Sequence, residues 1–328
     1  MSATVGVILG QVGTPDAPTP RAVKQYLSRF LSDRRVIDYP PWLWQPLLRG
    51  LILPLRSRRS ARLYQRIWTP QGSPLLVESE KQRQRLQDTL GAGYRVALGM
   101  AYAGPSFEQA IDNLLADGIT EVIVVPMFPQ YSSATTASVY DAAFAAATDR
   151  AGAARRFVPA LWCVPPYYED PGYVGALVKR IEDASAAGPP PDHIVLSFHG
   201  LPERYVTAGD PYRQHCDRTV AALAMALRWQ PSDYTVAFQS RFGPEKWLGP
   251  GTADVLTGLH ARGIRRPLVV APGFTTDCLE TLDELGNEGR VEFASGGGDA
   301  AAYRLCPCLN DQPEWIDALS RLITAVGC

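Results

Sequence analysis

Short apolar segments alternate with amphipathic ones along this sequence, and no other feature constrains the fold as strongly. Each short segment has four or five residues, is rich in Val, Ile and Leu, and is flanked by turn residues. Strands that are buried on both faces of a parallel sheet have this composition. Between these segments, apolar residues recur at helical spacing. The alternation predicts βαβ units and an α/β fold, with strands at residues 5–9, 122–126, 194–198, 235–238 and 268–271 and helices at 106–116, 212–227 and 253–262.

The two halves of the chain are weakly similar to each other. Residues 118–126 and 263–272 each begin with a Gly typical of a helix end, continue as a predicted strand and reach a Pro where the chain leaves the sheet. This repeat predicts two similar α/β halves that join near residues 152–170. The Pro-rich stretch at 188–192 is predicted to be a stiff loop within the second half and not the boundary.

Length and composition exclude several classes of protein. The 328 residues suffice for two domains, and 46% hydrophobic with 20% charged residues is typical of a globular chain. A net charge of −1 argues against general nucleic-acid binding. Six scattered cysteines do not form a secreted disulfide framework, and no apolar run is long enough to span a membrane. The N-terminus lacks the basic start and cleavage site of a signal peptide, so we expect a cytoplasmic protein.

One segment departs from the alternation. Residues 40–55 are apolar and rich in Trp and Pro, and five arginines follow between Arg56 and Arg66 with no acidic residue among them. One interpretation is a core helix followed by a solvated basic face. The other is an apolar lip with a basic collar, spanning residues 40–68, which suits a membrane surface or a large flat apolar ligand that carries carboxylates.

His199 ends one of the predicted strands and is followed by Gly200. In open α/β sheets, ligands bind beyond the carboxyl ends of the strands, and a Gly lets a ligand approach the backbone. An imidazole in this place suits proton transfer or metal contact, whereas the alternative is a hydrogen-bonded structural His. The other three histidines, His193, His215 and His260, are assigned to loops or helices and are expected to be structural or exposed.

A second predicted strand leads into a cluster of acidic residues at the start of a helix: Asp277, Glu280, Asp283 and Glu284. Acids in a first turn complement the helix dipole, and Thr276 or Asp277 suits an N-cap. The functional alternative depends on Glu280, which follows a strand end in the same half as His199. A His together with carboxylates binds divalent metals and also relays protons.

Cofactor motifs are missing from the chain. Cys306 and Cys308, with Cys328, have neither a zinc nor an iron–sulfur spacing, and most of the cysteines are expected to be buried, inert thiols. The glycine-rich motifs that bind phosphates do not occur either, so nucleotide binding is not expected.

Several motifs, in order along the chain, resemble those of one known family. The strongest is Ser-Phe-His-Gly-Leu-Pro-Glu-Arg-Tyr at 197–205, which continues to Gly-Asp-Pro-Tyr at 209–212. Next are Phe-Gln-Ser-Arg-Phe-Gly at 238–243 with Trp-Leu-Gly-Pro at 247–250, and Pro-Gly-Phe-Thr-Thr-Asp-Cys-Leu-Glu-Thr-Leu at 272–282. Shorter matches lie at 13–15, 72–75, 129–132 and 308–310. Together they resemble the ferrochelatase family, whose members insert ferrous iron into a porphyrin.

The resemblance implies an architecture and a reaction. The expected fold has two Rossmann-like, chelatase-type domains, each with a parallel sheet flanked by helices, with a porphyrin cleft between them. Residues 1–158 would form the N-terminal domain with the apolar lip, and 159–328 the C-terminal domain with His199 and Glu280. The reaction would be insertion of Fe²⁺ into protoporphyrin IX to form protohaem, the last step of haem biosynthesis. Iron and porphyrin are substrates, no organic cofactor and no nucleic acid are expected, and the lip would contact the inner face of the membrane peripherally.

The resemblance also implies roles for individual residues. His199 and Glu280 fall on the iron-contacting positions, and His199 would accept the protons that leave the pyrrole nitrogens. Asp277 and Glu284 would line a path for metal or protons. The porphyrin would be held by residues from both halves, namely Tyr64, Trp247, Phe274, Gln11 and Tyr131.

This chain departs from the family pattern at a few positions. Gln11 stands where Asn is usual, and Ala101 where many members have Arg. Ser133 stands where one animal-type [2Fe–2S] ligand would be, and the C-terminal cysteines have the wrong spacing, so no cluster is expected. Three alternatives to protoporphyrin IX chelation stay open: a coproporphyrin III ferrochelatase, a catalytically weak porphyrin- or haem-binding paralogue, and an enzyme for another metal or tetrapyrrole.

Overall fold

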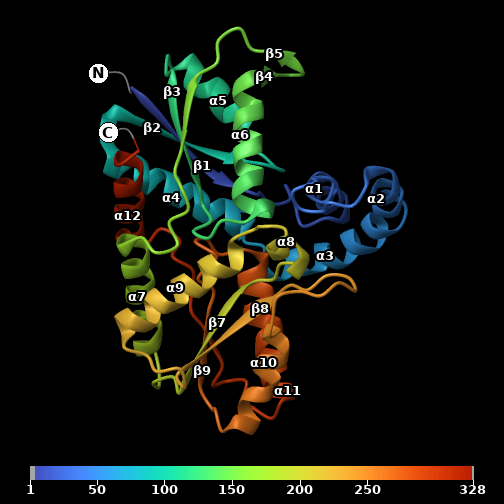
Figure 1. The fold of residues 1–328 in the computed structure, drawn as a ribbon, viewed down its shortest axis with the longest axis vertical. Helices are drawn as coiled ribbons and strands as arrows, with labels where there is room; N and C mark the ends of the chain where they lie inside the picture. Colours follow the sequence, from blue (N-terminus) through green and yellow to red (C-terminus); the bar gives the residue numbers. More distant parts are fainter. Residues whose placement is uncertain (1–3, 327–328) are drawn as a thin grey trace. The chain divides into compact units, whose positions relative to one another are not determined.

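Two parallel four-stranded sheets form the framework of the protein in a computed structural model that describes residues 4–326 (Figure 1). The strand order is β2-β1-β3-β6 in the first sheet and β10-β9-β7-β8 in the second. All neighbouring strands in these two sheets are parallel, and helices occur between successive strands. The predicted α/β architecture is confirmed.

By its internal packing the chain divides into two compact units. Unit 1 contains the first sheet, and comprises the described residues up to Phe128, Ser132–Pro166 and the C-terminal stretch from Ile316. Unit 2 contains the second sheet, and comprises Pro129–Tyr131 and Tyr167–Trp315. The domain boundary at 158/159 stays a prediction, because packing density alone does not establish where a folding domain ends.

The elements of unit 1 are β1 (Val5–Gln11), α1 (Pro20–Phe30), α2 (Pro41–Leu47), η1 (Leu48–Ile52), α3 (Leu53–Ile67), α4 (Pro74–Leu90), η2 (Gly91–Gly93), β2 (Tyr94–Met100), α5 (Phe107–Ala116), β3 (Glu121–Pro126), η3 (Ser133–Ala137), α6 (Ser138–Thr148), β4 (Asp149–Arg150), β5 (Ala153–Ala154) and β6 (Ala160–Cys163). Those of unit 2 are α7 (Pro171–Ala186), β7 (His193–His199), α8 (Glu203–Thr207), α9 (Tyr212–Leu227), β8 (Tyr234–Gln239), α10 (Thr252–Leu259), η4 (His260–Arg262), β9 (Pro267–Val270), η5 (Glu280–Glu288), α11 (Gly289–Ser295) and β10 (Arg304–Leu305). The last helix, α12 (Pro313–Thr324), begins among residues of unit 2 and continues among those of unit 1.

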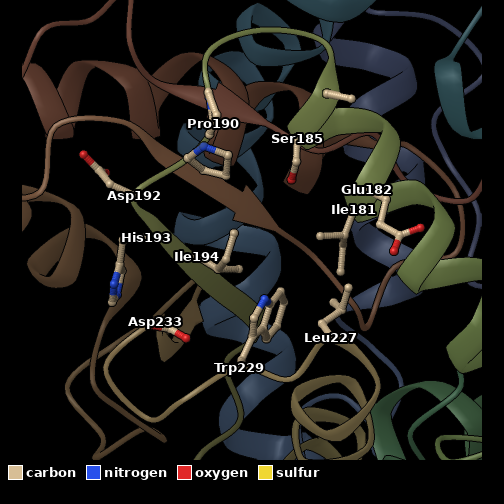
Figure 2. Close-up of a pocket in the computed structure, with 12 residues that line it drawn as sticks. Ile181, Glu182, Ser185, Pro190, Asp192, His193, Ile194, Leu227, Trp229 and Asp233 are labelled. Carbon is tan, nitrogen blue, oxygen red and sulfur yellow. The ribbon is translucent and has the colours of Figure 1, made fainter.

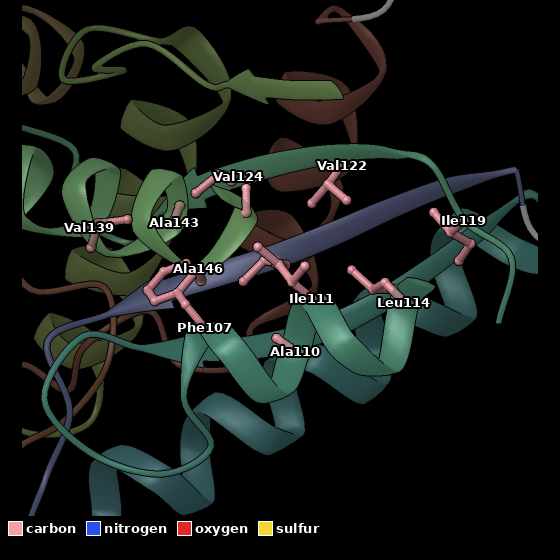
Figure 3. Packing of buried hydrophobic residues seen from close by; sticks show 12 residues of the cluster. Phe107, Ala110, Ile111, Leu114, Ile119, Val122, Val124, Val139, Ala143 and Ala146 are labelled. Atoms are coloured by element: carbon pink, nitrogen blue, oxygen red, sulfur yellow. The ribbon is translucent and has the colours of Figure 1, made fainter. Parts of the chain in front are cut away.

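Helices α5 and α6 pack against one face of the first sheet (Figure 3). α5 begins with a capping box, in which Ser106 and Gln109 each accept a hydrogen bond from the other's backbone N–H. Its apolar residues recur at helical spacing and form one stripe that faces the strands. The buried cluster consists of Ile8, Phe107, Ala110, Ile111, Leu114, Ile119, Val122, Val124, Val139, Ala143, Ala146 and Ala147.

The second sheet is organised around β7, which has β9 on one side and β8 on the other. Strand residues Val195, Ala237 and Val269 pack with Leu256 of α10 and Phe293 of α11. Because β7 is central, its first six residues are buried, and only the seventh, at the carboxyl end, is exposed. This strand therefore presents its last side chain to solvent at a fixed place.

The predicted strands and helices are all present, with strand bounds that differ by at most two residues. Five strands were missed: β2, β6 and β10 of the two parallel sheets, and the two-residue strands β4 and β5, which pair with each other. β2 contains Gly99, where a Cβ would lie 2.7 Å from Ile8 and 2.8 Å from Phe107, so a helix-packing requirement interrupts its apolar pattern. β6 lies at a sheet edge with alternate residues exposed, and β10 has two residues. β10 is too short to show an apolar run, and β6, although its four residues are all apolar, lies in the stretch 152–170 that was predicted to join the two halves.

The apolar lip folds as α2, the π-helical turn η1 and α3 in direct succession. Its side chains divide between a buried set and an exposed set. Trp44, Leu48 and Leu53 are buried, as expected of a core helix, whereas Trp42 is 78% exposed and Leu55 67% exposed. The segment therefore has one buried and one exposed apolar face.

Two further expectations from the sequence concern the Pro-rich stretch and membrane-spanning helices. Residues 188–192 form a connection between α7 and β7 inside unit 2, as predicted. No helix in the described range 4–326 is both long and apolar enough to cross a membrane. Residues 1–3, which begin the segment that lacks signal-peptide features, and Cys328 lie outside the described residues.

Candidate active site at the carboxyl edge of the second sheet

His199 is the last residue of β7, and its side chain is exposed at the carboxyl edge of the second sheet. Its Nδ1 lies 2.7 Å from the carbonyl oxygen of Gly200. A carbonyl oxygen only accepts hydrogen bonds, so in the neutral ring Nδ1 carries the proton and Nε2 carries the lone pair. The ring lies beside Phe274, with 6.5 Å between the centroids. The fold thus presents His199 as a base whose accepting atom is Nε2.

Gly200 follows the strand in a tightly packed place. Its N–H donates to the carbonyl of Gln239 at 2.7 Å. A Cβ at this position would lie 2.6 Å from the same oxygen and 3.1 Å from the ring of Trp247, so no larger residue fits. Pro202 and Trp247 then pair as an antiparallel bridge. The indole nitrogen of Trp247 is buried and has no hydrogen-bond partner among the described residues.

Glu284 of the π-helix η5 is held by the end of β8. Ser240 donates to it twice, through its backbone N–H at 2.7 Å and through its hydroxyl. Ser240 has φ of 64°, a left-handed conformation that is uncommon outside glycine. Burial raises the pKa of Glu284, while the Ser240 hydroxyl and the charge of His199 oppose the rise and the charge of Glu280 adds to it. The three ionisable groups therefore lie within electrostatic reach of one another.

Glu280 and Asp277 differ in which of their groups accepts hydrogen bonds: the backbone carbonyl of Glu280 and the side-chain carboxylate of Asp277. The backbone carbonyl of Glu280 accepts from the Gln239 side chain at 3.0 Å, which ties the start of η5 to the end of β8. The Asp277 carboxylate accepts from the Asn310 amide at 2.7 Å, from the Thr281 hydroxyl at 3.0 Å and from a backbone N–H in the same region. These bonds hold the 308–310 segment to the start of the helix, which is a structural function.

Tyr131 and Phe274 also belong to unit 2. Tyr131 is half-buried, and its N–H donates to Nδ1 of His215 at 3.1 Å. Phe274 follows β9 and is half-buried beside His199. Of the residues predicted for this unit, the structure groups His199 with Phe274, Glu280 and Glu284, and it places Trp247 against Gly200.

Gln11 and Tyr64 lie in unit 1. Gln11 is the buried last residue of β1, and its carbonyl accepts from the N–H of Ala101 at 2.9 Å. The two departures from the family pattern are therefore neighbours at the carboxyl edge of the first sheet. Arg29 of α1 donates to the carbonyl of Tyr102 at 3.4 Å, so a guanidinium from a distant segment lies next to this edge. Tyr64 is buried in α3.

The cysteines of the described residues are free thiols in mostly apolar surroundings. Cys216, Cys278, Cys306 and Cys308 are buried, and Cys163 is half-buried. Burial raises the pKa of each of these thiols. Within residues 4–326, no three His, Cys, Asp or Glu side chains converge as a ready-made metal-binding group.

A cavity of about 570 Å³ lies at the opposite, amino edge of the second sheet (Figure 2). It is lined by α7, the start of β7 and Trp229, and by none of the predicted site residues. His193 begins β7 here, so its assignment to a loop or helix is wrong. Its Nε2 lies 2.8 Å from the Thr235 hydroxyl.

Three polar residues that organise unit 2 were not assigned roles from the sequence. Gln239 is the buried last residue of β8 and Ser240 follows it, and a polar pair directly after the predicted apolar strand 235–238 is a signal that would have found them. His215 carried no such signal, because its partner Tyr131 is 84 residues away in the sequence.

Comparison with known proteins identifies the family. A family model described as Ferrochelatase matches residues 4–326. The chain belongs to the ferrochelatase family. Relatives named Ferrochelatase from Pectobacterium atrosepticum and Edwardsiella ictaluri are each 47% identical over 325 residues. The first match covers 98% of both chains, and the second 99% of both. A relative of the same name from Yersinia enterocolitica is 44% identical over 319 residues, with 97% of both chains covered.

Solved chelatases share the fold. SirB from Bacillus subtilis with Fe³⁺ superposes with a TM-score of 0.56 at 14% identity, covering 99% of this chain and 96% of that chain. CbiX, described as the terminal enzyme for biosynthesis of siroheme in denitrifying bacteria, gives 0.50 at 14% identity and covers 99% and 100%. At such identities the likeness concerns the fold alone, and it confirms the Rossmann-like, chelatase-type architecture expected for the ferrochelatase family.

Proposed function

We propose that this protein is a ferrochelatase that inserts Fe²⁺ into protoporphyrin IX and forms protohaem in the last step of haem biosynthesis. One observation carries the proposal beyond family membership. His199 stands exposed at the carboxyl edge of a parallel sheet with Nδ1 donating to a carbonyl, so that Nε2 is a preset proton acceptor.

The chemistry of insertion requires such a base. Two weakly acidic pyrrole N–H protons must leave as the metal enters, and we assign their removal, one after the other, to His199 Nε2, which must pass the first proton to the acidic residues of η5 before its single lone pair accepts the second. The imidazolium that forms is stabilised by Glu284, which Ser240 holds in place within electrostatic reach. Glu280 belongs to the same electrostatic group, and we assign it, with His199, to contact with the incoming iron.

The path for iron or protons is assigned to η5. Glu280 and Glu284 lie four residues apart on this helix, so that they follow each other along its length. Asp277 is left out of this path in our proposal, because its carboxylate is occupied by Asn310 and Thr281.

We assign porphyrin contacts to Trp247, Phe274 and Tyr131 of unit 2 and to Gln11 and Tyr64 of unit 1. The unpaired indole N–H of Trp247 supports its role, because a polar group of the substrate can satisfy this buried donor. Apolar contacts that favour a ruffled ring would expose the pyrrole lone pairs and so favour the distorted geometry of the transition state.

The proposal needs iron and porphyrin as substrates and no organic cofactor or nucleic acid. We also propose that the protein works in the cytoplasm without a [2Fe–2S] cluster. Cluster ligands must be thiolates, and burial holds the pKa of Cys278, Cys306 and Cys308 above the ordinary range.

Anaerobic Fe²⁺ insertion, followed by absorbance with protoporphyrin IX and coproporphyrin III side by side, tests the proposed function. Turnover with protoporphyrin IX supports it, whereas turnover with coproporphyrin III alone favours that branch of the family. Tight porphyrin binding with no turnover on either substrate would mean a binding paralogue, for which the neighbouring changes Gln11 and Ala101 are the structural argument.

We further propose that the apolar lip contacts the inner face of the membrane peripherally. Its exposed apolar side chains are Trp42, Leu43, Leu47, Leu51 and Leu55. Arg58, Arg59 and Arg62 are exposed on the adjoining helix α3, where they would attract anionic headgroups.

Replacing Leu51 and Leu55 together by Glu should reduce binding to anionic liposomes at least about tenfold in a sedimentation assay, because two charges enter the apolar face. Met225→Glu is the matched control, since Met225 is 81% exposed on α9, away from the lip in sequence. Equal liposome binding by the double variant and the control would contradict the membrane role.

A further inference from the structure

The stretch Pro129–Tyr131 packs with unit 2 although the residues on both sides of it belong to unit 1. Its hydrogen bonds explain this. The carbonyl of Pro129 accepts from the N–H of Tyr167 at 3.1 Å, and the Gln130 side chain donates to the Thr219 hydroxyl at 2.9 Å. The N–H of Tyr131 donates to His215 Nδ1 at 3.1 Å, which ties the backbone of Tyr131 to α9.

The bond between Tyr131 and His215 depends on the protonation state of the ring. A backbone N–H only donates, so Nδ1 of His215 must carry a lone pair. The neutral ring with its proton on Nε2 satisfies this requirement. An imidazolium carries protons on both nitrogens and cannot accept the bond.

The surroundings of His215 favour the neutral ring. The imidazole stacks on Tyr168 with 3.8 Å between the ring centroids. Burial lowers the pKa of His215, Arg218 on the same helix lowers it further, and the carboxylates of Asp210 and Glu169, which face it from the segments before α9 and α7, oppose the shift. Arg218 is itself paired with Glu169, which limits how far that carboxylate can stabilise a protonated ring.

The stretch that His215 holds lies against the loop that carries Phe274. A Cβ at Gly273 would lie 3.4 Å from the side-chain oxygen of Gln130, so the two segments are in contact. Tyr173 donates to the carbonyl of Pro272 and also lies 3.4 Å from the Gln130 amide. Fixing the backbone at Tyr131 therefore fixes it beside the β9 loop of the candidate active site.

We propose that His215 is a positioning residue for the porphyrin: its neutral ring holds the backbone of Tyr131 beside the Phe274 loop, and protonation of the ring releases it. The inference rests on the proposed function, in which Tyr131 and Phe274 contact the porphyrin. It predicts that porphyrin affinity falls on acidification, and that replacing His215 changes porphyrin affinity while kcat at saturating porphyrin stays close to that of the wild type at the same pH, because His215 touches neither the iron nor the pyrrole nitrogens. The loss of one such bond corresponds to about a threefold to tenfold weakening.

Two variants of His215 separate its functions. His215→Asn keeps an accepting oxygen near the place of Nδ1 but does not titrate. His215→Phe keeps the aromatic stack on Tyr168 but has no acceptor. His193→Asn is the control, because burial also lowers the pKa of His193 and this residue lies at the opposite edge of the sheet.

Protoporphyrin affinity is measured by fluorescence quenching at pH 8 and at the lowest pH at which each protein stays folded, for the full-length wild type and the three variants. The wild type and His193→Asn should weaken about threefold to tenfold at the lower pH, and His215→Asn should not. His215→Phe should be weak at both values. Without porphyrin, the Tyr131 amide resonance in ¹⁵N-tyrosine-labelled protein should shift with pH in the wild type and stay constant in His215→Asn.

The outcomes separate this inference from the proposed function. A wild type that binds and metallates porphyrin, while His215→Asn weakens on acidification as much as the wild type, overturns the inference alone. A Tyr131 amide that ignores pH in the wild type also overturns it, even if His215→Phe does not fold. A wild type that binds no porphyrin at any pH overturns the proposed function, and the inference with it.

Discussion

The two ends of β7 each carry a histidine, and they place it in opposite surroundings. His199 at the carboxyl end is exposed, with Nδ1 bound to the carbonyl of Gly200 and Nε2 left as an acceptor. His193 at the amino end is 3% exposed, and its Nε2 is engaged with the Thr235 hydroxyl. One residue type on one strand thus suits proton transfer at one edge and a structural role at the other. The role of each histidine depends on which of its ring nitrogens the fold leaves free to accept a proton.

The largest expected effect is the difference in iron-insertion rate between a variant that lacks His199 and one that lacks His193. His199→Ala should slow iron insertion by about 10²- to 10⁴-fold, the usual contribution of a general base, while porphyrin affinity stays within a few fold. His193→Ala, at the amino edge, should change the insertion rate by less than about threefold. Anaerobic insertion kinetics with both variants test this prediction. Wild-type turnover by His199→Ala would show that His199 is not the general base.

The glycines near the two ends should differ in stability. Gly200→Ala should cost about 1–3 kcal/mol in free energy of unfolding, because its Cβ would meet the Gln239 carbonyl at 2.6 Å. Gly188→Ala, before the amino end, would meet only the tip of the Arg304 side chain at 3.3 Å and should change stability by less than about 0.5 kcal/mol. Denaturant unfolding of both variants measures the difference, and equal values would mean that the Gly200 turn relaxes without cost.

A carboxylate at each edge gives a smaller contrast. Glu284→Gln keeps the shape of the side chain but removes the negative charge near His199, so iron insertion should slow about tenfold through poorer stabilisation of the imidazolium. Glu182→Gln, in the lining of the amino-edge cavity, is the control and should leave the rate unchanged. Insertion rates of both variants measured from pH 6 to pH 8 test this prediction. A wild-type rate for Glu284→Gln at every pH would exclude a role for Glu284 in the chemical step.

The smallest effect is a pH dependence of stability. Burial lowers the pKa of His193 below its ordinary value of 6.5, so the folded protein favours the neutral ring. Its stabilising contribution is fully present above pH 6.5 and is lost as the pH falls toward the folded-state pKa. His193→Asn should therefore flatten the acid-induced fall in the free energy of unfolding by less than about 1 kcal/mol. Parallel curves for variant and wild type between pH 7 and pH 5 would show that His193 does not titrate there.

Much of the fold followed from the sequence because buried parallel strands and capped helices are local patterns. The segment at 106–116 could be predicted from its apolar spacing, and Ser106 and Gln109 close the helix start as expected of their types. β10 could not, because two residues carry no apolar periodicity, and β6 was not found because it lies in the stretch that was predicted to join the two halves. The sequence also did not show which face of the apolar lip is buried and which is exposed, because burial depends on the residues that pack against each face.

The candidate site shows the same division. His199 could be placed at a strand end, and the family motifs selected Glu280 for iron contact and assigned Asp277 and Glu284 to one and the same path. Only the structure showed that Asn310 and Thr281 occupy the Asp277 carboxylate while Ser240 holds Glu284. The contact between His215 and Tyr131 joins residues 84 positions apart, so no local pattern contains it.

By itself the sequence determined the family, the alternation of strands and helices, and the strand end that carries His199, because these depend on short-range composition and on motifs. The tertiary structure alone decided which nitrogen of His199 and of His193 is engaged in a hydrogen bond, which carboxylates are occupied, and where a left-handed Ser240 directs its N–H. The physical reason is that the sequence determines the type of each side chain, whereas hydrogen bonds and desolvation determine its proton affinity. Both depend on groups that the fold brings together from distant parts of the chain.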